Sequence, residues 1–354
     1  MAYTTIDDPS AYFQTATYTG SGGTGGHAIV NDGNSDLQPD LVWLKQRSYA
    51  SSHRLMDSTR GGNKMLESDT VNAEATYGYI SSFDTDGFTL GYSDNSFDGY
   101  GREYVGWQWK ANGGTTSSNT SGTITTTVQA NTDAGFSIVT WAGNASNATM
   151  GHGLGTTPQV IISKARGTTN DWNVYHRDLD ATAPYNYLLN LHNTNARSAA
   201  TGSWGASLSD INSNTFYKKY WINYNTNMIA YCFAEKQGYS KFGKYIGNGS
   251  LNGPFIYTGF KPAFVIVKQR NTARPWQLFD NKRDGYNENQ MPRLQPNDSA
   301  AEVQDAGASM DLLSNGFKVR SNQTGANQSG GTYIYMAFAE NPFVTSTGIP
   351  TTAR

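Results

Sequence analysis

The side chains that most often carry out chemistry are few in this sequence, and their spacing does not suit it. His152 lies in a glycine-rich loop, Gly151–Gly155, which could hold a metal ion or a phosphate. A phosphate loop needs a strand before it and a helix after it, whereas here a strand is expected to follow. Four other histidines form no pair at ligand spacing: His27, His53, His176 and His192. We therefore assign His152 to loop structure and predict no metal site and no cofactor.

Nucleophile and acid–base motifs are missing as well. The sequence has no Gly-x-Ser-x-Gly elbow and no His-Glu-x-x-His motif. A pair of carboxylates for glycoside hydrolysis is the most serious enzymatic alternative, but Asp and Glu are scarce on the recognisable strands. Cys232, the single cysteine, lies on an expected core strand, where a buried thiol is usually inert. We therefore predict that the protein is not an enzyme.

A group of charged residues recurs at similar places in three segments of the chain. Its members are Lys45, Arg47, Asp57, Arg60, Lys164, Arg166, Lys268, Arg270, Asp280 and Arg283. With His53, the first copy could form a catalytic cluster, and the second copy has His176 and Arg177 at the corresponding place. A polar group that recurs in every copy of a repeat is more often part of the scaffold. We therefore predict a structural charge network beside each repeated unit.

These charges belong to a longer repeated pattern, which is the strongest signal in the sequence. Each copy opens with a β-branched or aromatic run that starts at a proline and ends in Lys-x-Arg, and it closes with an aromatic-rich run. The opening runs are Pro39–Arg47, Pro158–Arg166 and Pro262–Arg270, and the closing runs are Tyr104–Lys110, Met228–Glu235 and Tyr333–Glu340. A leader run precedes each proline, at 12–18, 135–141 and 241–246. Landmarks at opposite ends of the unit give the same two periods, about 120 and about 105 residues.

The elements that must position these residues are short strands. Gly, Ser, Thr and Asn carry most of the polarity and only 15% of the residues are charged, a composition that favours turns and strands. The best helical candidate is Ala301–Leu313. We predict an all-β chain of three tandem β-sandwich repeats, jelly-roll or concanavalin-like, in a row and with little helix. The expected domains are 1–113, 114–238 and 239–354, with linkers at 112–122 and 237–240.

Charge and hydropathy exclude several classes of protein. The chain has 26 basic and 28 acidic residues and a formal net charge of -2, so it lacks the basic surface that nucleic-acid binding usually needs. No apolar run approaches the roughly 18 residues of a membrane span, and the first ten residues lack the features of a secretory signal. A single cysteine excludes an intrachain disulfide. We expect no nucleic-acid partner, no membrane insertion, and stability that comes from close packing or oligomerisation.

One loop before the closing run differs in all three copies, which is typical of a recognition surface carried on a scaffold. It spans 92–102 in the first copy and 320–331 in the third, whereas in the second it is rich in aromatic and polar side chains. The candidate recognition residues there are Tyr217, Tyr220, Trp221 and Tyr224, preceded by Trp204. Such residues suit a glycan or a protein partner. The alternative is that Trp204, Tyr220 and Trp221 pack on a neighbouring domain or subunit.

Several motifs resemble one known family. They are Gly135-Phe-Ser-Ile-Val-Thr140, Gly151-His-Gly-Leu-Gly-x-x-Pro158, Gly238-Tyr-Ser-Lys-Phe-Gly243 and Tyr335-Met-Ala-Phe-Ala-Glu-Asn-Pro342. Together they look like tail-associated virion proteins of marine tailed bacteriophages, which carry a repeated domain of uncharacterised function. The resemblance covers nearly the whole chain. The closing runs are also loosely similar to SPRY or concanavalin-like sandwiches.

The resemblance implies a structural protein of the virion, assembled in the host cytoplasm: a tail-fibre or tail-tip component that presents loops to a host-surface glycan or protein. It implies other virion proteins as partners and a homo-oligomer, and it supplies no catalytic residues. The chain has no coiled-coil or β-helical stalk pattern, which argues for a compact appendage. The alternatives are a capsid decoration or cement protein without a receptor role and, less favoured, a particle-bound glycan hydrolase.

Overall fold

The computed structural model describes residues 3–23, 25–77, 79–92, 94–283, 287, 290–305 and 307–351. Within this part of the chain the regular structure is almost entirely β-strand. The α-helical content is the single turn α1 (Thr324–Asn327), and four short 3-10 helices accompany it. None of the helices described is long and apolar enough to cross a membrane. The all-β fold class that the sequence predicts is confirmed.

The first third of the chain, which we call lobe 1, contains a six-stranded antiparallel sheet in the order β1-β9-β3-β4-β5-β6. A three-stranded sheet, β2-β8-β7, packs on it. The strands are β1 (Phe13–Thr19), β2 (His27–Ile29), β3 (Leu41–Gln46), β4 (Arg54–Asp57), β5 (Lys64–Glu67), β6 (Ala75–Thr76), β7 (Ile80–Asp84), β8 (Gly87–Leu90) and β9 (Glu103–Trp109). Val42 and Met56 of the large sheet and Phe88 of the small one share a buried cluster, so lobe 1 is a sandwich.

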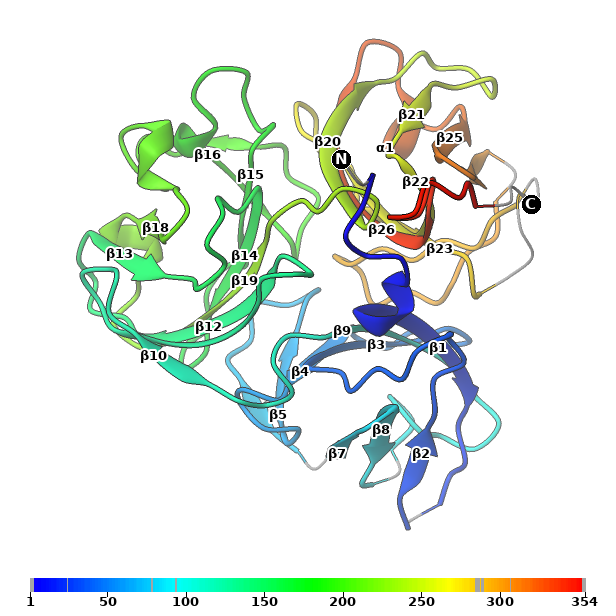
Figure 1. The fold of residues 1–354 in the computed structure, drawn as a ribbon, viewed down its shortest axis with the longest axis horizontal. Helices are drawn as coiled ribbons and strands as arrows, with labels where there is room; N and C mark the ends of the chain where they lie inside the picture. Colours follow the sequence, from blue (N-terminus) through cyan, green and yellow to red (C-terminus); the bar gives the residue numbers. More distant parts are fainter. Residues whose placement is uncertain are drawn as a thin grey trace.

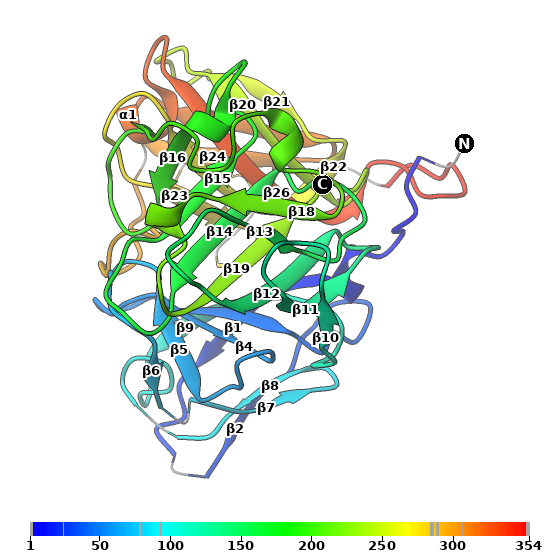
Figure 2. The ribbon, with the colours of Figure 1, turned by 90° about the vertical axis from the view of Figure 1, so that its left-hand side faces the viewer.

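Lobe 2 has an eight-stranded sheet, β10-β11-β12-β19-β14-β15-β16-β17, and a small sheet of β13 and β18. The strands are β10 (Ser117–Asn119), β11 (Thr126–Asn131), β12 (Phe136–Ala142), β13 (Ala148–Gly151), β14 (Val160–Ala165), β15 (Asn173–His176), β16 (Tyr187–Asn190), β17 (Ser198–Ala199), β18 (Thr215–Lys218) and β19 (Asn227–Phe233). Part of the linker expected at 112–122 therefore becomes strand β10. Figure 2 shows this large sheet with β10 and β11 along one margin.

Lobe 3 has a four-stranded sheet, β20-β26-β22-β23, and a small sheet, β21-β25-β24. The strands are β20 (Ser240–Ile246), β21 (Phe255–Tyr257), β22 (Phe260–Gln269), β23 (Gln277–Asp280), β24 (Ala308–Leu313), β25 (Gly316–Ser321) and β26 (Thr332–Pro342). The order of leader, closing, opening and second strand is thus the same in each lobe: β1-β9-β3-β4, β12-β19-β14-β15 and β20-β26-β22-β23. This is the order that three copies of one unit would have.

The three lobes are arranged around a common centre, not in a row (Figure 1). One buried cluster contains Trp107 and Trp109 from lobe 1, Phe233 from lobe 2 and Phe264 and Phe338 from lobe 3. The closing strands β9, β19 and β26 each place alternate large residues of one face in this cluster. Their other faces point into the separate core of each lobe. Both faces of each closing strand are therefore buried.

Phe338 lies at the middle of this central cluster. Its ring centroid is 5.4 Å from that of Phe13, 5.6 Å from that of Trp109 and 5.8 Å from that of Phe233. Rings from all three lobes therefore meet at one side chain. Aromatic pairs at these separations add to the stabilisation that comes from burying their area.

The helical candidate Ala301–Leu313 is wrong: residues 301–305 form no helix, and the chain forms β24 from Ala308 to Leu313 (residue 306 lies outside the described residues). Met310 and Leu312 alternate into the core of lobe 3. A two-residue turn then joins Leu313 to Gly316 of β25, its partner in the ladder. Burial of alternate side chains outweighs the weak local helical preference of this segment.

We expect Phe338→Ala to lower the free energy of unfolding by about 3–5 kcal/mol, because a large ring leaves a packed site. Since rings of all three lobes contact it, the variant and the parent should each unfold in one cooperative transition. Chemical denaturation followed by tryptophan fluorescence and circular dichroism measures both quantities. Tyr100→Ala, at a side chain that is 86% exposed, is the control and should change little. Separate transitions for the lobes would contradict the shared core.

Candidate functional site

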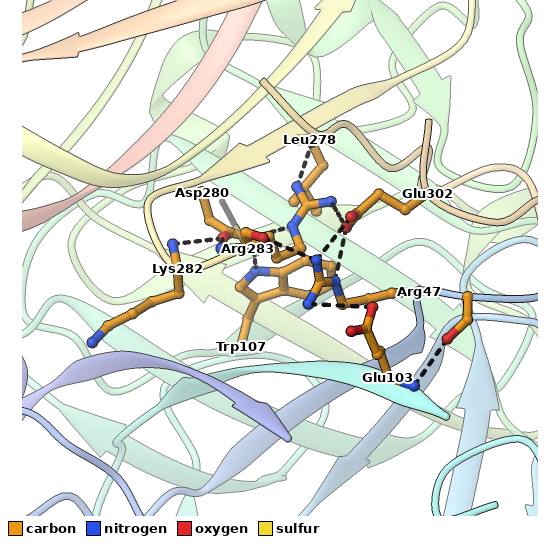
Figure 3. Close-up of polar contacts among 9 residues, drawn as sticks. Arg47, Glu103, Trp107, Leu278, Asp280, Lys282, Arg283 and Glu302 are labelled. Atoms are coloured by element: carbon orange, nitrogen blue, oxygen red, sulfur yellow. Dashed lines mark hydrogen bonds and ion pairs between the residues drawn. The ribbon is translucent and has the colours of Figure 1, made fainter. Parts of the chain in front are cut away.

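The repeated charged residues gather where one lobe meets the next, and we call these contacts seam 1–3, seam 1–2 and seam 2–3. At seam 1–3 (Figure 3) the fully buried Arg283 pairs with Asp280, Nε to Oδ2 2.7 Å. Its Nη1 lies 2.9 Å from Glu302 Oε2 and its Nη2 donates to the carbonyl of Leu278 at 3.1 Å. Trp107 of lobe 1 donates from Nε1 to Asp280 Oδ2 at 2.9 Å. The buried carboxylate is therefore neutralised and hydrogen-bonded from both sides of the seam.

Arg47 of lobe 1 completes this seam by reaching across to lobe 3. Its Nε and Nη2 donate to the two carboxylate oxygens of Glu302 at 3.0 and 2.9 Å, a bidentate pair. The backbone joins the same residues, because the N–H of Glu302 donates to the carbonyl of Arg47 at 2.8 Å. Glu302 thus bridges Arg47 and Arg283.

Seam 1–2 has the same arrangement built from equivalent residues. Arg60 pairs with Asp57, Nε to Oδ2 2.5 Å, and with Glu74, Nη1 to Oε2 3.0 Å. Arg166 of lobe 2 donates to both oxygens of Glu74 at 2.7 and 2.9 Å. Tyr231 takes the position of Trp107, and its hydroxyl donates to Asp57 Oδ2 at 2.8 Å. Burial opposes ionisation of Glu74, yet hydrogen bonds from Arg166 and the charge of Arg60 hold the pKa of Glu74 below its usual range.

The three repeated lysines lie in the seams but bond to carbonyl groups of the backbone. Lys45 Nζ donates to the carbonyl of Ser299 at 3.2 Å, Lys164 to that of Val71 at 3.0 Å and Lys268 to that of Thr194 at 2.9 Å. Burial lowers the pKa of Lys45 and of Lys164 to about 8 and that of Lys268 to about 7. Each lysine therefore fixes a loop of the neighbouring lobe.

Seam 2–3 departs from this plan in its charges. His176 takes the position of the aspartate, and Met336 replaces the hydrogen-bonding Trp107 or Tyr231. Arg197 occupies the position of Glu74 and Glu302. Its backbone N–H donates to the carbonyl of Arg270 at 2.8 Å, as the N–H of each glutamate donates to the carbonyl of the arginine in its own seam. Arg270 therefore meets another arginine and donates to the carbonyl of Asp178. Burial lowers the pKa of Arg270, and the charge of Arg197 acts in the same direction.

The hydrogen bonds of His176 in this seam fit the neutral imidazole, because one ring nitrogen accepts and the other donates. Nδ1 accepts from the N–H of Asp178 at 3.0 Å, and Nε2 lies 3.1 Å from the carbonyl of Tyr335, to which it donates. Burial lowers the pKa of His176 to about 4. A proton on Nδ1 would oppose the N–H of Asp178 and would add charge beside two arginines.

The structure thus brings the predicted charged residues together in pairs of lobes, not beside each sandwich. Arg47 reaches Arg283 directly and through Glu302, whereas Arg166 reaches Arg60 through Glu74. Glu74 and Glu302 complete the seams, and sequence reasoning missed both. They lie outside the repeated runs, and their counterpart in lobe 2 is an arginine, so no recurrence pointed to them.

The candidate recognition residues lie at the outer end of lobe 2, but they do not form one exposed surface. Trp204 is wholly buried, so its assignment to the recognition surface is wrong. Its ring packs beside Tyr175, with centroids 5.7 Å apart, and beside Lys218 Nζ at 5.4 Å. Tyr217, Trp221 and Tyr224 are partly exposed, whereas Tyr220 is 52% exposed.

The isolated candidates for chemistry have structural partners. His152 Nε2 lies 3.0 Å from the carbonyl of Asn212, and its Nδ1 accepts from the N–H of Leu154 at 3.2 Å. Cys232 is buried in the core of lobe 2, where burial raises the pKa of its thiol. No cluster of three or more His, Cys, Asp or Glu side chains that could hold a metal ion occurs in the part of the chain that the structure describes.

We expect Arg60→Met to lower the free energy of unfolding by about 3–5 kcal/mol, because it leaves the buried carboxylate of Asp57 without its cationic partner. Arg283→Met should have a similar effect at the equivalent seam. Arg320→Met is the matched control. Arg320 pairs with Asp311 but is 42% exposed, so its loss should cost less than about 1 kcal/mol. Urea denaturation measures the three losses. If they were equal, the buried seam arginines would contribute no more to stability than an exposed ion pair does.

We expect acid to weaken the protein through His176. Its folded pKa of about 4 lies below the ordinary 6.5, so the unfolded chain binds the proton more tightly and stability falls as the pH drops from 6.5 towards 4. At pH 5 the loss relative to pH 7 should be about 2 kcal/mol. His176→Gln, which keeps a donor for the Tyr335 carbonyl, should lack this component. An unchanged dependence on pH in urea titrations of the variant would assign the acid sensitivity to other groups.

Comparison with known proteins identifies a family for this chain. Neither the curated proteins nor the solved structures contain a match to this chain. A family model does match, over residues 8–342, and this span includes all three lobes and all three seams. The chain therefore belongs to the family described as a domain of unknown function, DUF7483.

Proposed function

We propose that this chain is a non-enzymatic structural protein of a virus particle, a tail-fibre or tail-tip component that presents loops for recognition of the host surface. The resemblance of its motifs to those of tail-associated virion proteins of tailed bacteriophages supports this location. The three-lobed fold supports the structural role, because such a body holds loops in fixed positions without a flexible stalk.

The observation that carries the proposal is how the buried polar side chains are used. Asp57, Arg60, Asp280 and Arg283 have fully buried side chains. Hydrogen bonds with Tyr231, Trp107 and Arg47 link these four residues to the neighbouring lobe. At an active site, some such groups would face a cavity with shifted proton affinity. Arg283 does border a cavity, with Arg47 and Glu302, but all four side chains are bonded to partners in the seams. This is the behaviour of a scaffold.

The recognition surface that we propose is the outer tip of lobe 2 around Tyr220. The rings of Tyr220 and Trp221 lie edge to face, with centroids 5.1 Å apart. Lys219 Nζ lies 4.2 Å from the Trp221 ring, and the side-chain oxygen of Asn147 accepts the Tyr220 N–H at 3.0 Å. This places aromatic, amide and cationic groups side by side, and aromatic rings with polar handles suit both sugars and proteins.

Trp221 has a second role that makes it a poor single test. Its Nε1 donates to Ser203 Oγ at 3.2 Å, and its ring packs against the core of lobe 2. Its removal would therefore affect stability and recognition together. Tyr220 is the residue whose exposed ring separates the two effects.

The proposal includes partners and assembly. Other virion proteins would hold the chain to the particle, and we expect a homo-oligomer in the assembled virion. A capsid decoration protein with the same fold is the second candidate, because a rigid body held by seams serves that role as well. Labelling particles with antibody against this chain and imaging them should place the label at the tail. Label spread over the capsid would favour decoration.

We expect Tyr220→Ala particles to adsorb to host cells at least tenfold more slowly, about 1.4 kcal/mol in recognition, because an exposed ring that contacts the receptor is lost. The melting temperature should stay within about 1 °C of the parent. Tyr100→Ala, at the tip of lobe 1, is the matched control and should adsorb normally. Normal adsorption of the Tyr220→Ala particles would show that Tyr220 at the tip of lobe 2 does not contact the receptor, and would contradict the proposed recognition surface.

We also expect no glycan turnover. Incubation of the protein with host polysaccharide, followed by an assay for new reducing ends, measures this. Steady release of oligosaccharide in proportion to protein concentration would overturn the non-enzymatic assignment.

A further inference from the structure

Lobe 2 uses the side chain of one buried glutamine, on an added strand, to contact lobe 1. Gln129 lies on β11 opposite Ile138 of β12 and is fully buried at seam 1–2. Its Nε2 donates to Ser58 Oγ at 2.9 Å and to Thr59 Oγ1 at 2.8 Å. Its Oε1 accepts the N–H of Asn112 at 3.1 Å. The side-chain amide of an added strand thereby joins lobe 2 to lobe 1.

The equivalent positions at seam 1–3 line a cavity of about 230 Å³. Thr15 corresponds to Ile138, because they pair with the equivalent residues Trp107 and Tyr231 of the closing strands. Asn281 follows Asp280 as Ser58 follows Asp57, and Lys282 corresponds in the same way to Thr59. Asn341 lies three residues after Phe338 of β26 in the sequence, just as Asn112 lies three residues after Trp109. The equivalents at seam 1–3 of the residues around Gln129 are therefore Thr15, Asn281, Lys282 and Asn341, and all of them line the cavity.

Two polar atoms at this cavity have no hydrogen-bond partner among the described residues. They are Thr15 Oγ1 and Asn281 Oδ1, and both side chains are buried. A buried polar atom without a partner is destabilising and is rare in folded proteins. A side-chain amide placed as Gln129 is placed would lie beside both residues, as Gln129 lies beside Ser58 and Ile138, and could donate to Asn281 Oδ1 as Gln129 donates to Ser58.

The strand beside the cavity has an open edge. In lobe 2 the edge of β12 is covered by β11, whereas β1 stands at the end of its sheet in the part of the chain that the structure describes. The equivalent edge strand in lobe 3, β20, carries Lys241 and Lys244, and such charges discourage pairing. The sequence of β1, Phe-Gln-Thr-Ala-Thr-Tyr-Thr, has no charge. Its edge is therefore suited to a further strand.

We propose that the edge of β1 accepts a short extended strand from a partner protein, uncharged and similar to β11, which places a glutamine side chain in the cavity between lobes 1 and 3. The strand would pair with Thr15–Thr19. Beyond Thr15 the edge ends, because the side chain of Gln14 holds a loop through the N–H of Gly33 at 2.9 Å. The backbone supplies affinity and the amide supplies specificity, as in other strand additions. The inference goes beyond the proposed function and does not depend on the location of the protein.

The first experiment uses a fluorescent peptide with the sequence of residues 124–131, Ile-Thr-Thr-Thr-Val-Gln-Ala-Asn, and the whole chain. We expect saturable binding of one peptide per chain by fluorescence anisotropy. A peptide with leucine in place of its glutamine should bind about tenfold more weakly or worse, since one charge-neutral hydrogen-bonded pair is lost. No binding at millimolar peptide overturns the inference, and equal binding of the two peptides overturns the role of the cavity.

The second experiment changes the edge. Thr17 is exposed and corresponds to Lys244 of β20, so Thr17→Lys copies the charge of that edge without disturbing the core. We expect it to abolish peptide binding while the melting temperature is unchanged. Ser213→Lys, at an exposed loop of lobe 2, is the matched control and should bind as the parent does.

The two remaining outcomes are also decisive. Binding that survives Thr17→Lys would place the peptide elsewhere and overturn the inference. If light scattering shows that the parent chain self-associates and that Thr17→Lys is monomeric, the occupant of the edge is a second copy, and the proposal of a separate partner fails.

Asn281→Ala, which removes one of the two atoms without a partner, should weaken binding of the peptide without loss of stability.

Discussion

The closing strand of each lobe must bury both of its faces, and the rest of the structure depends on this constraint. On β19, Tyr231 and Phe233 face the centre of the molecule, while Ala230 and Cys232 face the core of lobe 2. A lobe by itself would expose the large face to water. Three such faces turned towards one another remove the largest rings from solvent at once, so the hydrophobic effect favours a closed arrangement of three lobes over a row.

Burial alone does not fix how the lobes meet, because apolar contact has little direction. The seams supply direction. Each opening strand sends a lysine and an arginine into the next lobe, and the contacts run head to tail: lobe 1 to lobe 3, lobe 3 to lobe 2 and lobe 2 to lobe 1. A heterologous contact whose rotation closes gives a ring, here within one chain. The ring is uneven, because seam 2–3 has His176, Arg197 and Met336 where the others have acids and hydrogen-bond donors.

This arrangement separates the residues that hold the molecule from those that it can offer to partners. The charged groups of the seams, among them Arg60 and Arg283, are occupied and buried. The surfaces with unused binding capacity lie outside the seams: the tip of lobe 2 around Tyr220, and the uncharged edge of β1 beside a cavity with two unpaired polar atoms. We propose recognition at the first and attachment at the second, and these two proposed roles use different surfaces.

The sequence by itself determined the all-β class, the position of each leader, opening and closing strand, and the identity of most seam residues. These properties are local or repeated, and alternation of side chains reports them directly. The tertiary structure decided what depends on neighbours distant in sequence. It placed the repeated charges between lobes, brought in Glu74 and Glu302 from segments without a repeated pattern, buried Trp204 and made a strand of residues 308–313. Partners across a seam are chosen by packing in three dimensions, and no spacing along the chain encodes that choice.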